Sequence, residues 1–262
     1  MNFKKLKNKI GKFIKYFLNI LNIKVLKKIH IYGPFKMDAE YVFSNFSNWS
    51  KQHNDCFEYC IEQTKDSLYF IDVGAHIGLV TLSASSVMNP GSKLIAFEPA
   101  TQNRTILKKN IRMNRAKLKS EIIIEKDLVG DLDDLNVNFY EIKNNVSGIN
   151  SVIKKKENSV LTKKKQITLD NYCFKNNIIP QIIKIDAEGY EYHILLGARN
   201  LLKLHKPKLV ISFHPNILKE IKIDETLIYK FFNEINYQIY DKDKKKVSKI
   251  NFGEYIILPN ES

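Results

Sequence analysis

The chain has 262 residues, 44% of them hydrophobic, and a formal net charge of +14 at pH 7. This length and composition fit one globular unit with one core, and no apolar run reaches the roughly 20 residues that a membrane-spanning helix needs. The three cysteines, an odd and low number, argue against a disulfide-stabilised secreted domain and favour a reducing compartment, here taken as the cytoplasm.

The positive charge is concentrated in an N-terminal arm, which we assign to residues 1–36. Residues 1–37 contain ten lysines and no acidic residue. From Phe3 to Leu21 apolar residues recur every three or four positions, which predicts a basic amphipathic helix. Two interpretations are open: residues 3–29 dock on the anionic inner face of a membrane, or the apolar stripe covers the core or a partner subunit. Equal sedimentation with anionic and neutral liposomes would contradict the first interpretation.

The rest of the chain lacks the charge pattern of a nucleic-acid-binding protein. Only four of the 42 basic residues are arginine, the residue that base and phosphate recognition favours. We therefore expect no DNA partner, and we interpret the lysine runs at 154–156, 163–165 and 244–246 as solvated loops.

Residues 37–67 are expected to form a helical cap or edge layer, and residues 68–262 the main unit. There, apolar strands alternate with helices, which predicts an α/β fold with a mostly parallel sheet and helices on both faces. The predicted strands are 68–73, 93–97, 120–126, 181–186 and 207–213, then a closing hairpin of 237–240 and 254–258 with one antiparallel strand. The predicted helices are 77–88, 101–113, 190–203 and 224–235, with short extra strands at 136–142 and 150–153.

A glycine turn joins the first of these strands to its helix. It runs from Asp72 to Gly78 and reads D-V-G-A-H-I-G. Gly74 can adopt backbone angles denied to other residues and leaves room for a ligand, and the first N–H groups of the helix point to the same place. The turn lacks the third glycine of a dinucleotide fingerprint and instead has the Asp-x-Gly-x-x-x-Gly pattern of S-adenosylmethionine (SAM) methyltransferases. The cofactor-binding residues expected here are Asp72, Val73, Gly74, Ala75, His76 and Gly78.

The second strand ends at Glu98 and Pro99, with Glu98 lying 20 residues past Gly78. An acidic side chain at this spacing and at this strand end can accept hydrogen bonds from both ribose hydroxyls of a nucleoside. A carboxylate that only caps a strand–helix junction is the alternative. Glu98, Pro99 and, after the third strand, Asp127 and Leu128 complete the predicted cofactor site.

The fourth strand carries a second motif, I-K-I-D-A-E-G over residues 183–189. Polar Lys184, Asp186 and Glu188 alternate with apolar residues, so the carboxyl end of the strand should present Asp186 and Glu188 near the cofactor. We expect Lys184 to have a structural role, paired with a carboxylate.

With these motifs in the same order, the chain resembles the FkbM-type family of SAM-dependent methyltransferases. The matching segments, within about residues 68–215, are 70–78, 97–99, 147–151, 168–170, 183–189 and 196–198. The resemblance implies a class I methyltransferase fold of the Rossmann-like type, SAM as cofactor, and an active-site loop at 147–151. It also implies methyl transfer to an oxygen, commonly on a sugar, glycan, glycolipid or small metabolite. Many members have a glutamate at the end of strand five, where this chain has His214 as a candidate replacement.

Methyl transfer to a hydroxyl requires a residue within hydrogen-bond reach that removes the proton. Our candidates are Asp186, Glu188 and His214, of which the histidine titrates near neutral pH. We assign no metal site, and a hydrated magnesium ion on Asp186 and Glu188 is the alternative.

Two further functions are open. A ribose methyltransferase acting on RNA is one, although all seven prolines are isolated, which argues against the Pro-Pro motif of amino-group methylation. The other is a non-catalytic, membrane-associated module that kept the fold, against which the intact Asp72, Gly74, Gly78 and Glu98 argue.

Overall fold

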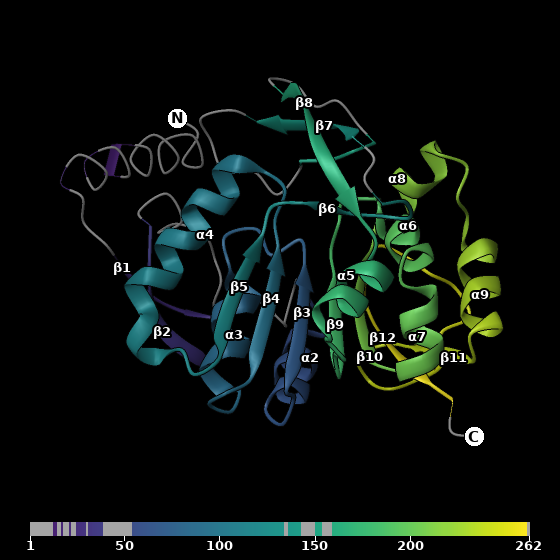
Figure 1. The fold of residues 1–262 in the computed structure, drawn as a ribbon, viewed down its shortest axis with the longest axis horizontal. Coiled ribbons are helices and arrows are strands. Elements are labelled where there is room, and N and C mark those ends of the chain that lie inside the picture. Colours follow the sequence, from purple (N-terminus) through teal and green to yellow (C-terminus); the bar gives the residue numbers. More distant parts are fainter. Residues whose placement is uncertain are drawn as a thin grey trace, which may run out of the picture.

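Figure 1 shows the computed structural model of the chain, in which helices cover a central sheet. A three-stranded sheet lies beyond the upper ends of strands β3 and β4 (Figure 1). The structure describes residues 13–14, 17, 21, 25–29, 31–38, 54–133, 136–142, 150–153 and 159–260.

The central sheet has seven strands in the order β11-β12-β10-β9-β3-β4-β5. The pairs from β10 to β5 are parallel, and β12 is antiparallel to both β10 and β11. This confirms the mostly parallel sheet with an antiparallel strand in a C-terminal hairpin. The strands are β3 (Tyr69–Val73), β4 (Lys93–Phe97), β5 (Glu121–Glu125), β9 (Ile182–Ile185), β10 (Lys208–Phe213), β11 (Tyr237–Tyr240) and β12 (Gly253–Pro259).

Each face of the sheet is buried under its own helices because side chains alternate along a strand. In β3, Ile71 and Val73 belong to one core and Phe70 to the other. The Ile71 core is covered by α5 (Leu169–Asn176), α6 (Glu191–Leu196), α7 (Arg199–His205), α8 (Pro215–Glu220) and α9 (Glu225–Glu234). The Phe70 core is covered by α2 (Phe57–Thr64), α3 (Leu79–Val87) and α4 (Thr101–Asn114), which a short 3₁₀ helix (Arg115–Lys117) follows.

The helix predicted at 190–203 is two helices, α6 and α7, with a break at Gly197. The main chain packs so closely there that a Cβ on Gly197 would lie 1.9 Å from the carbonyl oxygen of Gly130. The Gly197 carbonyl accepts a hydrogen bond from the Asp170 N–H, and the Asp170 carboxylate accepts from the first N–H groups of α7. The break leaves the first N–H groups of α7 without helical acceptors, and the Asp170 carboxylate replaces those acceptors.

The three-stranded sheet has the order β6-β8-β7 and was only partly predicted. Its strands are β6 (Leu128–Val129), β7 (Asn136–Ile142) and β8 (Ser159–Ile167). The run 163–165, which we interpreted as a solvated loop, lies within β8, so that interpretation was wrong. The cause is tertiary pairing: β8 runs antiparallel to β7, and the Lys164 ammonium meets the buried Glu141 carboxylate at 2.9 Å. In place of the strand expected at 150–153, Ser151 forms an isolated bridge with Tyr140.

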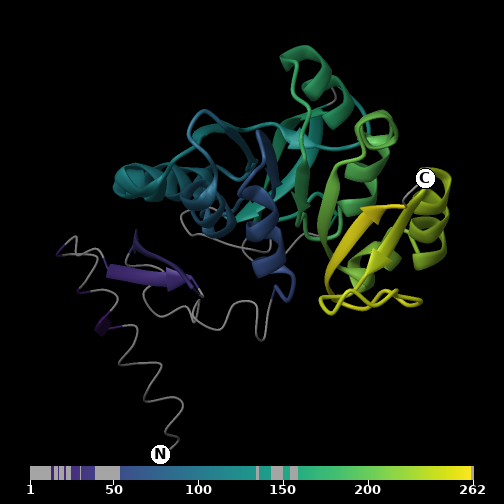
Figure 2. The same ribbon diagram turned by 90° about the horizontal axis from the view of Figure 1, so that it is seen from below.

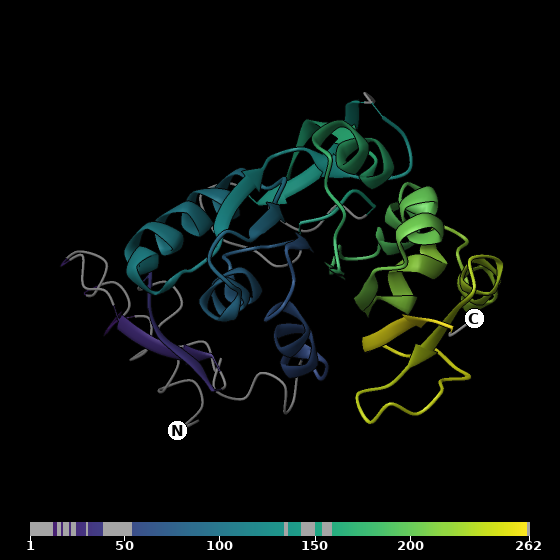
Figure 3. The ribbon, with the colours of Figure 1, turned by 60° about the horizontal axis from the view of Figure 1, so that its bottom comes forward.

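The strands β1 (Val25–Ile29) and β2 (Tyr32–Met37) pair as a hairpin, which the sequence did not predict. Phe35 and Met37 are buried in the Phe70 core, and Asn114 exchanges two hydrogen bonds with the backbone of Lys36. The end of the predicted arm is therefore a strand packed on α3 and α4, because its apolar residues find partners there. The hairpin and the C-terminal strands lie at opposite ends of the molecule (Figures 2 and 3).

The helix predicted from Phe3 to Leu21 lies mostly outside the described residues. Within it Phe13, Ile14 and Phe17 are helical. In the cap expected at 37–67, residues 39–53 are also outside the described set, and α2 is the helix found. No helix in the described part of the chain is both long and apolar enough to cross a membrane.

Candidate functional site

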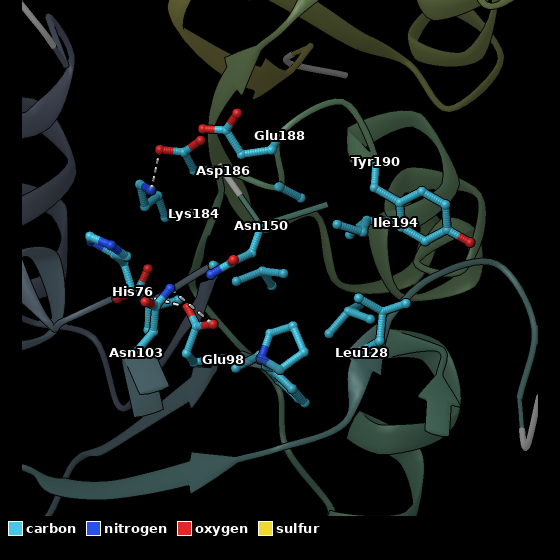
Figure 4. Close-up of a pocket in the computed structure, with 18 of the residues that line it drawn as sticks. His76, Glu98, Asn103, Leu128, Asn150, Lys184, Asp186, Glu188, Tyr190 and Ile194 are labelled. Carbon is cyan, nitrogen blue, oxygen red and sulfur yellow. Dashed lines mark hydrogen bonds and ion pairs between the residues drawn. The ribbon is translucent and has the colours of Figure 1, made fainter. Parts of the chain in front are cut away.

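A cavity opens at the carboxyl ends of β3, β4 and β9 (Figure 4). From β3 the chain continues to β4 and β5 on one side, and it later returns to β9 and β10 on the other. Such a reversal of strand order separates the loops at the strand ends, which is where doubly wound sheets bind ligands. The enclosed part of the cavity measures about 160 Å³, and its mouth is open to solvent.

The glycine turn forms one wall of this cavity, but the space beside Gly74 is taken by the protein itself. Gly74 has a φ of +82°, and a Cβ there would lie 1.9 Å from the carbonyl oxygen of Asp186. The N–H groups of Gly74 and Ala75 both donate to the carbonyl of Phe97 at 3.0 Å. The expectation that this glycine makes room for a ligand is therefore corrected: it lets the loop after β3 approach the loop after β9.

Glu98 lies at one end of the cavity and is held by backbone donors. Its Oε2 accepts from the His76 N–H at 2.7 Å and its Oε1 from the Ala100 N–H at 2.8 Å, with the Asn103 amide at 3.5 Å. Burial raises the pKa of Glu98 to about 7, although these donors favour the charged form. Oε1 thus accepts from two donors and Oε2 from one, which leaves one acceptor site, on Oε2, for a ligand hydroxyl.

Lys184 is a buried ammonium below the opposite end of the cavity. It pairs with Asp186 Oδ2 at 3.3 Å, as expected for a structural lysine, and it lies beside Asp72 in the register of β3 and β9. Burial alone would lower the pKa of Lys184, but Asp186, Asp72 and Glu254 raise it above its usual value. For Asp186 the effects are opposite: burial alone would raise its pKa, but the charges of Lys184 and His214 hold it below the usual value.

Asp72 is fully buried and only partly satisfied. Its Oδ2 accepts from the Thr81 hydroxyl at 2.7 Å, whereas its Oδ1 has no hydrogen-bond partner among the described residues. Burial raises the pKa of Asp72. Because a buried acceptor without a partner is costly, Asp72 Oδ1 is suited to a donor from a ligand in the cavity that it lines.

Asp186, Glu188 and His214 converge at the end of β9. His214 Nε2 lies 3.9 Å from Asp186 Oδ1 and 3.7 Å from Glu188 Oε1, and His214 Nδ1 bonds to Glu191 Oε1 at 2.8 Å. Glu188 has a φ of 49°, a conformation that costs a non-glycine residue on the order of 1 kcal/mol and is common at functional sites. Figure 4 shows Asp186 and Glu188 together, across the cavity from Glu98.

The surroundings of His214 do not fit a general base. Burial would lower the pKa of His214, but the hydrogen bond from its ring to Glu191 and the charges of Glu191, Asp186 and Glu188 raise it to about 9. With only these partners, the imidazole is already protonated at neutral pH and has no lone pair to accept a proton. This raised pKa argues against His214 as the base at neutral pH.

The cavity collects most of the residues predicted from the sequence. Those that line it are Asp72, Val73, Gly74, Ala75, His76, Glu98, Pro99, Leu128, Asp186 and Glu188. Gly78 does not line the cavity. It is the left-handed residue just before α3, and a Cβ at this position would contact Leu107. Asp127 does not line it either, since it lies in the bend between β5 and β6 and the wall starts at Leu128.

Other lining residues were missed by sequence reasoning. They are Leu79, Val80, Phe97, Asn103, Val129, Phe139, Asn150, Val152, Lys184, Ala187, Tyr190 and Ile194. Asn150 had a signal, because it falls in the segment 147–151 that the resemblance marked as an active-site loop. Residues 143–149 lie outside the described set. Phe139 had no signal in the sequence, because β7 reaches the cavity only through its pairing with β8.

A second cavity adjoins the first. His214 lines it together with residues of α8, α9 and the segment before β12, and Glu188 lines both cavities. The ring of Phe252 is 72% exposed and lies over His214, with 5.3 Å between ring centroids. The carboxylate of Glu188 therefore stands where the two cavities meet.

A family model described as the Methyltransferase FkbM domain matches residues 72–239, which contain both motifs and the walls of the first cavity. The chain belongs to the FkbM methyltransferase family. No curated protein sequence matches it.

Several solved structures of methyltransferases are similar to this FkbM-family chain. The FkbM methyltransferase of Methylobacillus flagellatus KT is 20% identical with a TM-score of 0.46, and the match covers 74% of this chain and 44% of that one. The chain thus spans less than half the length of that protein. A putative caffeoyl-CoA O-methyltransferase of Staphylococcus aureus is 10% identical with a TM-score of 0.46, covering 95% and 92%. A precorrin-6y C5,15-methyltransferase of Geobacter metallireducens GS-15 is 14% identical with a TM-score of 0.45, covering 79% and 88%.

The contact between Gly74 and Asp186 yields a prediction with an internal control. Gly74→Ala should destabilise the fold by about 3 kcal/mol or more, because the new methyl group forces β3 and β9 apart. Gly91 has a similar φ of +89° but nothing within 4 Å of its Cβ position, so Gly91→Ala reports the backbone strain alone. Urea unfolding of both variants measures the difference, and equal losses of stability would contradict the steric explanation.

Proposed function

We propose that this FkbM-family chain is a SAM-dependent O-methyltransferase that acts on a hydroxyl of a sugar, glycan or glycolipid intermediate in the cytoplasm. The position of Glu188 carries the proposal. It lines both a cavity with the features of a nucleoside site and a second cavity that can hold an acceptor. Of the segment 3–29 first considered for membrane contact, residues 25–29 form β1 with Ile29 buried in the Phe70 core, so the proposal keeps contact of residues 3–24 with an anionic membrane, which the liposome comparison tests.

The residues of the first cavity fit SAM. Glu98 would accept a ribose hydroxyl, and the apolar Leu128, Pro99 and Phe139 would cover the adenine. Asp72 Oδ1, a buried acceptor with no hydrogen-bond partner among the described residues, would take a donor from the amino end. When bound, SAM supplies a methyl group on a positively charged sulfur, which suits the acidic end of the cavity.

The second cavity supports a hydroxyl-rich acceptor. An exposed aromatic ring, Phe252, lines this cavity together with Asn216 and Asn251. Amides both donate to and accept from hydroxyl groups, and an aromatic ring offers a flat apolar surface. A sugar unit placed there would bring a hydroxyl to Glu188.

Glu188 is the proposed acceptor of the hydroxyl proton. Asp186 is less basic than usual because Lys184 and His214 stabilise its charged form, and protonated His214 cannot accept a proton at neutral pH. Lys184 would hold Asp186 in place at the same end of the cavity, where Glu188, the acceptor hydroxyl and the methyl group would be aligned.

Transfer of labelled methyl groups to cell-surface polysaccharide fractions and to total RNA tests the function. We expect label in a glycan fraction, and about a 100-fold loss of rate in Glu188→Gln with little change in the binding of S-adenosylhomocysteine (SAH). Glu121→Gln, an exposed glutamate on β5, is the matched control. Label in RNA instead would favour the ribose methyltransferase. SAH binding with no labelled fraction would favour the non-catalytic module.

The pKa of Glu98 predicts a pH-dependent affinity for SAH. Below pH 7 the carboxyl of Glu98 is mostly protonated, and a neutral acid accepts hydroxyl groups less well. If only the charged form binds, affinity should be about tenfold lower at pH 6 than at pH 8. Calorimetry at the two pH values measures this change, and Glu98→Gln should abolish it. A change of the same size in Glu98→Gln would assign the dependence to another group.

A further inference from the structure

Three potential ligand atoms face one another where the two cavities meet. One ligand atom each from Asp186, Glu188 and His214 lies within 4.8 Å of the others. His214 Nε2 is 3.9 Å from Asp186 Oδ1 and 3.7 Å from Glu188 Oε1, too far for hydrogen bonds. Two ligands about 2.1 Å from the same ion lie at most about 4.2 Å apart, so the two spacings from His214 allow it to share an ion with either carboxylate.

The imidazole of His214 is held in the orientation of a metal ligand. Its Nδ1 bonds to Glu191, a carboxylate with no solvent exposure, at 2.8 Å. Its Nε2 makes no hydrogen bond with any described residue, although His214 is 9% exposed and points at the two carboxylates. Metal-binding histidines commonly use this arrangement, in which a carboxylate fixes one ring nitrogen and leaves the other for the ion.

The charges around the three residues also favour a cation. Lys184 faces Asp186, Asp72 and Glu254, and His214 faces Asp186, Glu188 and Glu191. Two cationic side chains thus meet five carboxylates in a largely buried region. The Lys184 ammonium pairs with Asp186 Oδ2, and Asp186 Oδ1 faces His214. The side chains of Asp186 and Glu188 are each 27% exposed, so an ion can enter from the cavity.

We propose that Asp186, Glu188 and His214 form a binding site for one divalent transition-metal ion. Two carboxylate oxygens and one imidazole nitrogen suit Mn²⁺, Fe²⁺ or Zn²⁺ better than Ca²⁺ or Mg²⁺, because hard cations prefer oxygen ligands alone. The ion would replace the proton on Nε2 and leave coordination positions open toward the second cavity. Its role in orienting an acceptor hydroxyl rests on the proposed function, whereas its binding does not.

Titration of the chelator-treated full chain with Mn²⁺, by calorimetry and by the loss of the free-ion spin-resonance signal, tests the site. We expect one Mn²⁺ per chain, bound at least about tenfold more weakly by Glu188→Gln and by His214→Gln, and to a smaller extent by Glu191→Gln. His193→Gln is the matched control, because His193 pairs with Asp131 at 2.9 Å with no third ligand nearby in the described structure. This control should bind Mn²⁺ like the unaltered chain.

Circular dichroism of each variant establishes that it is folded. The proposal is overturned if the unaltered chain binds Mn²⁺ no better than folded Glu188→Gln and His214→Gln, or if Mg²⁺ at equal concentration displaces Mn²⁺. SAH binding by the same metal-free samples separates the two proposals. SAH binding without Mn²⁺ binding rejects the ion alone, and the absence of both rejects the cofactor site as well.

Discussion

The parallel pairing of β3 with β9 is the constraint on which the site depends. The Asp186 N–H donates to the carbonyl of Val73 at 3.0 Å, and Gly74 lies directly against the Asp186 carbonyl. This contact brings together loops more than 100 residues apart in the chain and sets the two ends of one cavity. A side chain at position 74 would separate them, so the glycine serves strand packing before it serves any ligand.

Buried charge organises the floor of that cavity. Lys184 is almost fully buried, and an ammonium there is tolerated only because carboxylates on β3, β9 and β12 surround it. Glu254 of β12 accepts hydrogen bonds from Asn54, Cys56 and Ser212. The same network therefore links the segment before α2 to strands β10 and β12. The same buried charges stabilise the fold and surround the candidate site. The ammonium of Lys184 offsets part of the negative charge of the carboxylates that lie close together beside the cavity.

Local sequence patterns predicted most of the central sheet because each strand is apolar and bounded by turn residues. β4 matches its predicted bounds, and Glu98 and Asp186 lie at the strand ends where the motifs placed them. The patterns failed for β8, whose lysines resemble a loop until Lys164 meets Glu141, and for the hairpin of β1 and β2, for which no strand was predicted. In both cases a partner distant in the sequence decided the conformation.

The sequence by itself determined the alternation of strands and helices, the glycine turn and the acidic ends of β4 and β9, since these depend on short-range periodicity and spacing. Only the tertiary structure decided the hydrogen-bond partners and the pKa values of the acidic groups and of His214. The pKa of His214 lies above its usual value because Glu191, 23 residues earlier, bonds to its ring. The pKa of Glu98 is about 7 because the surrounding fold removes water from it. Such effects depend on neighbours and burial, which a linear pattern does not contain.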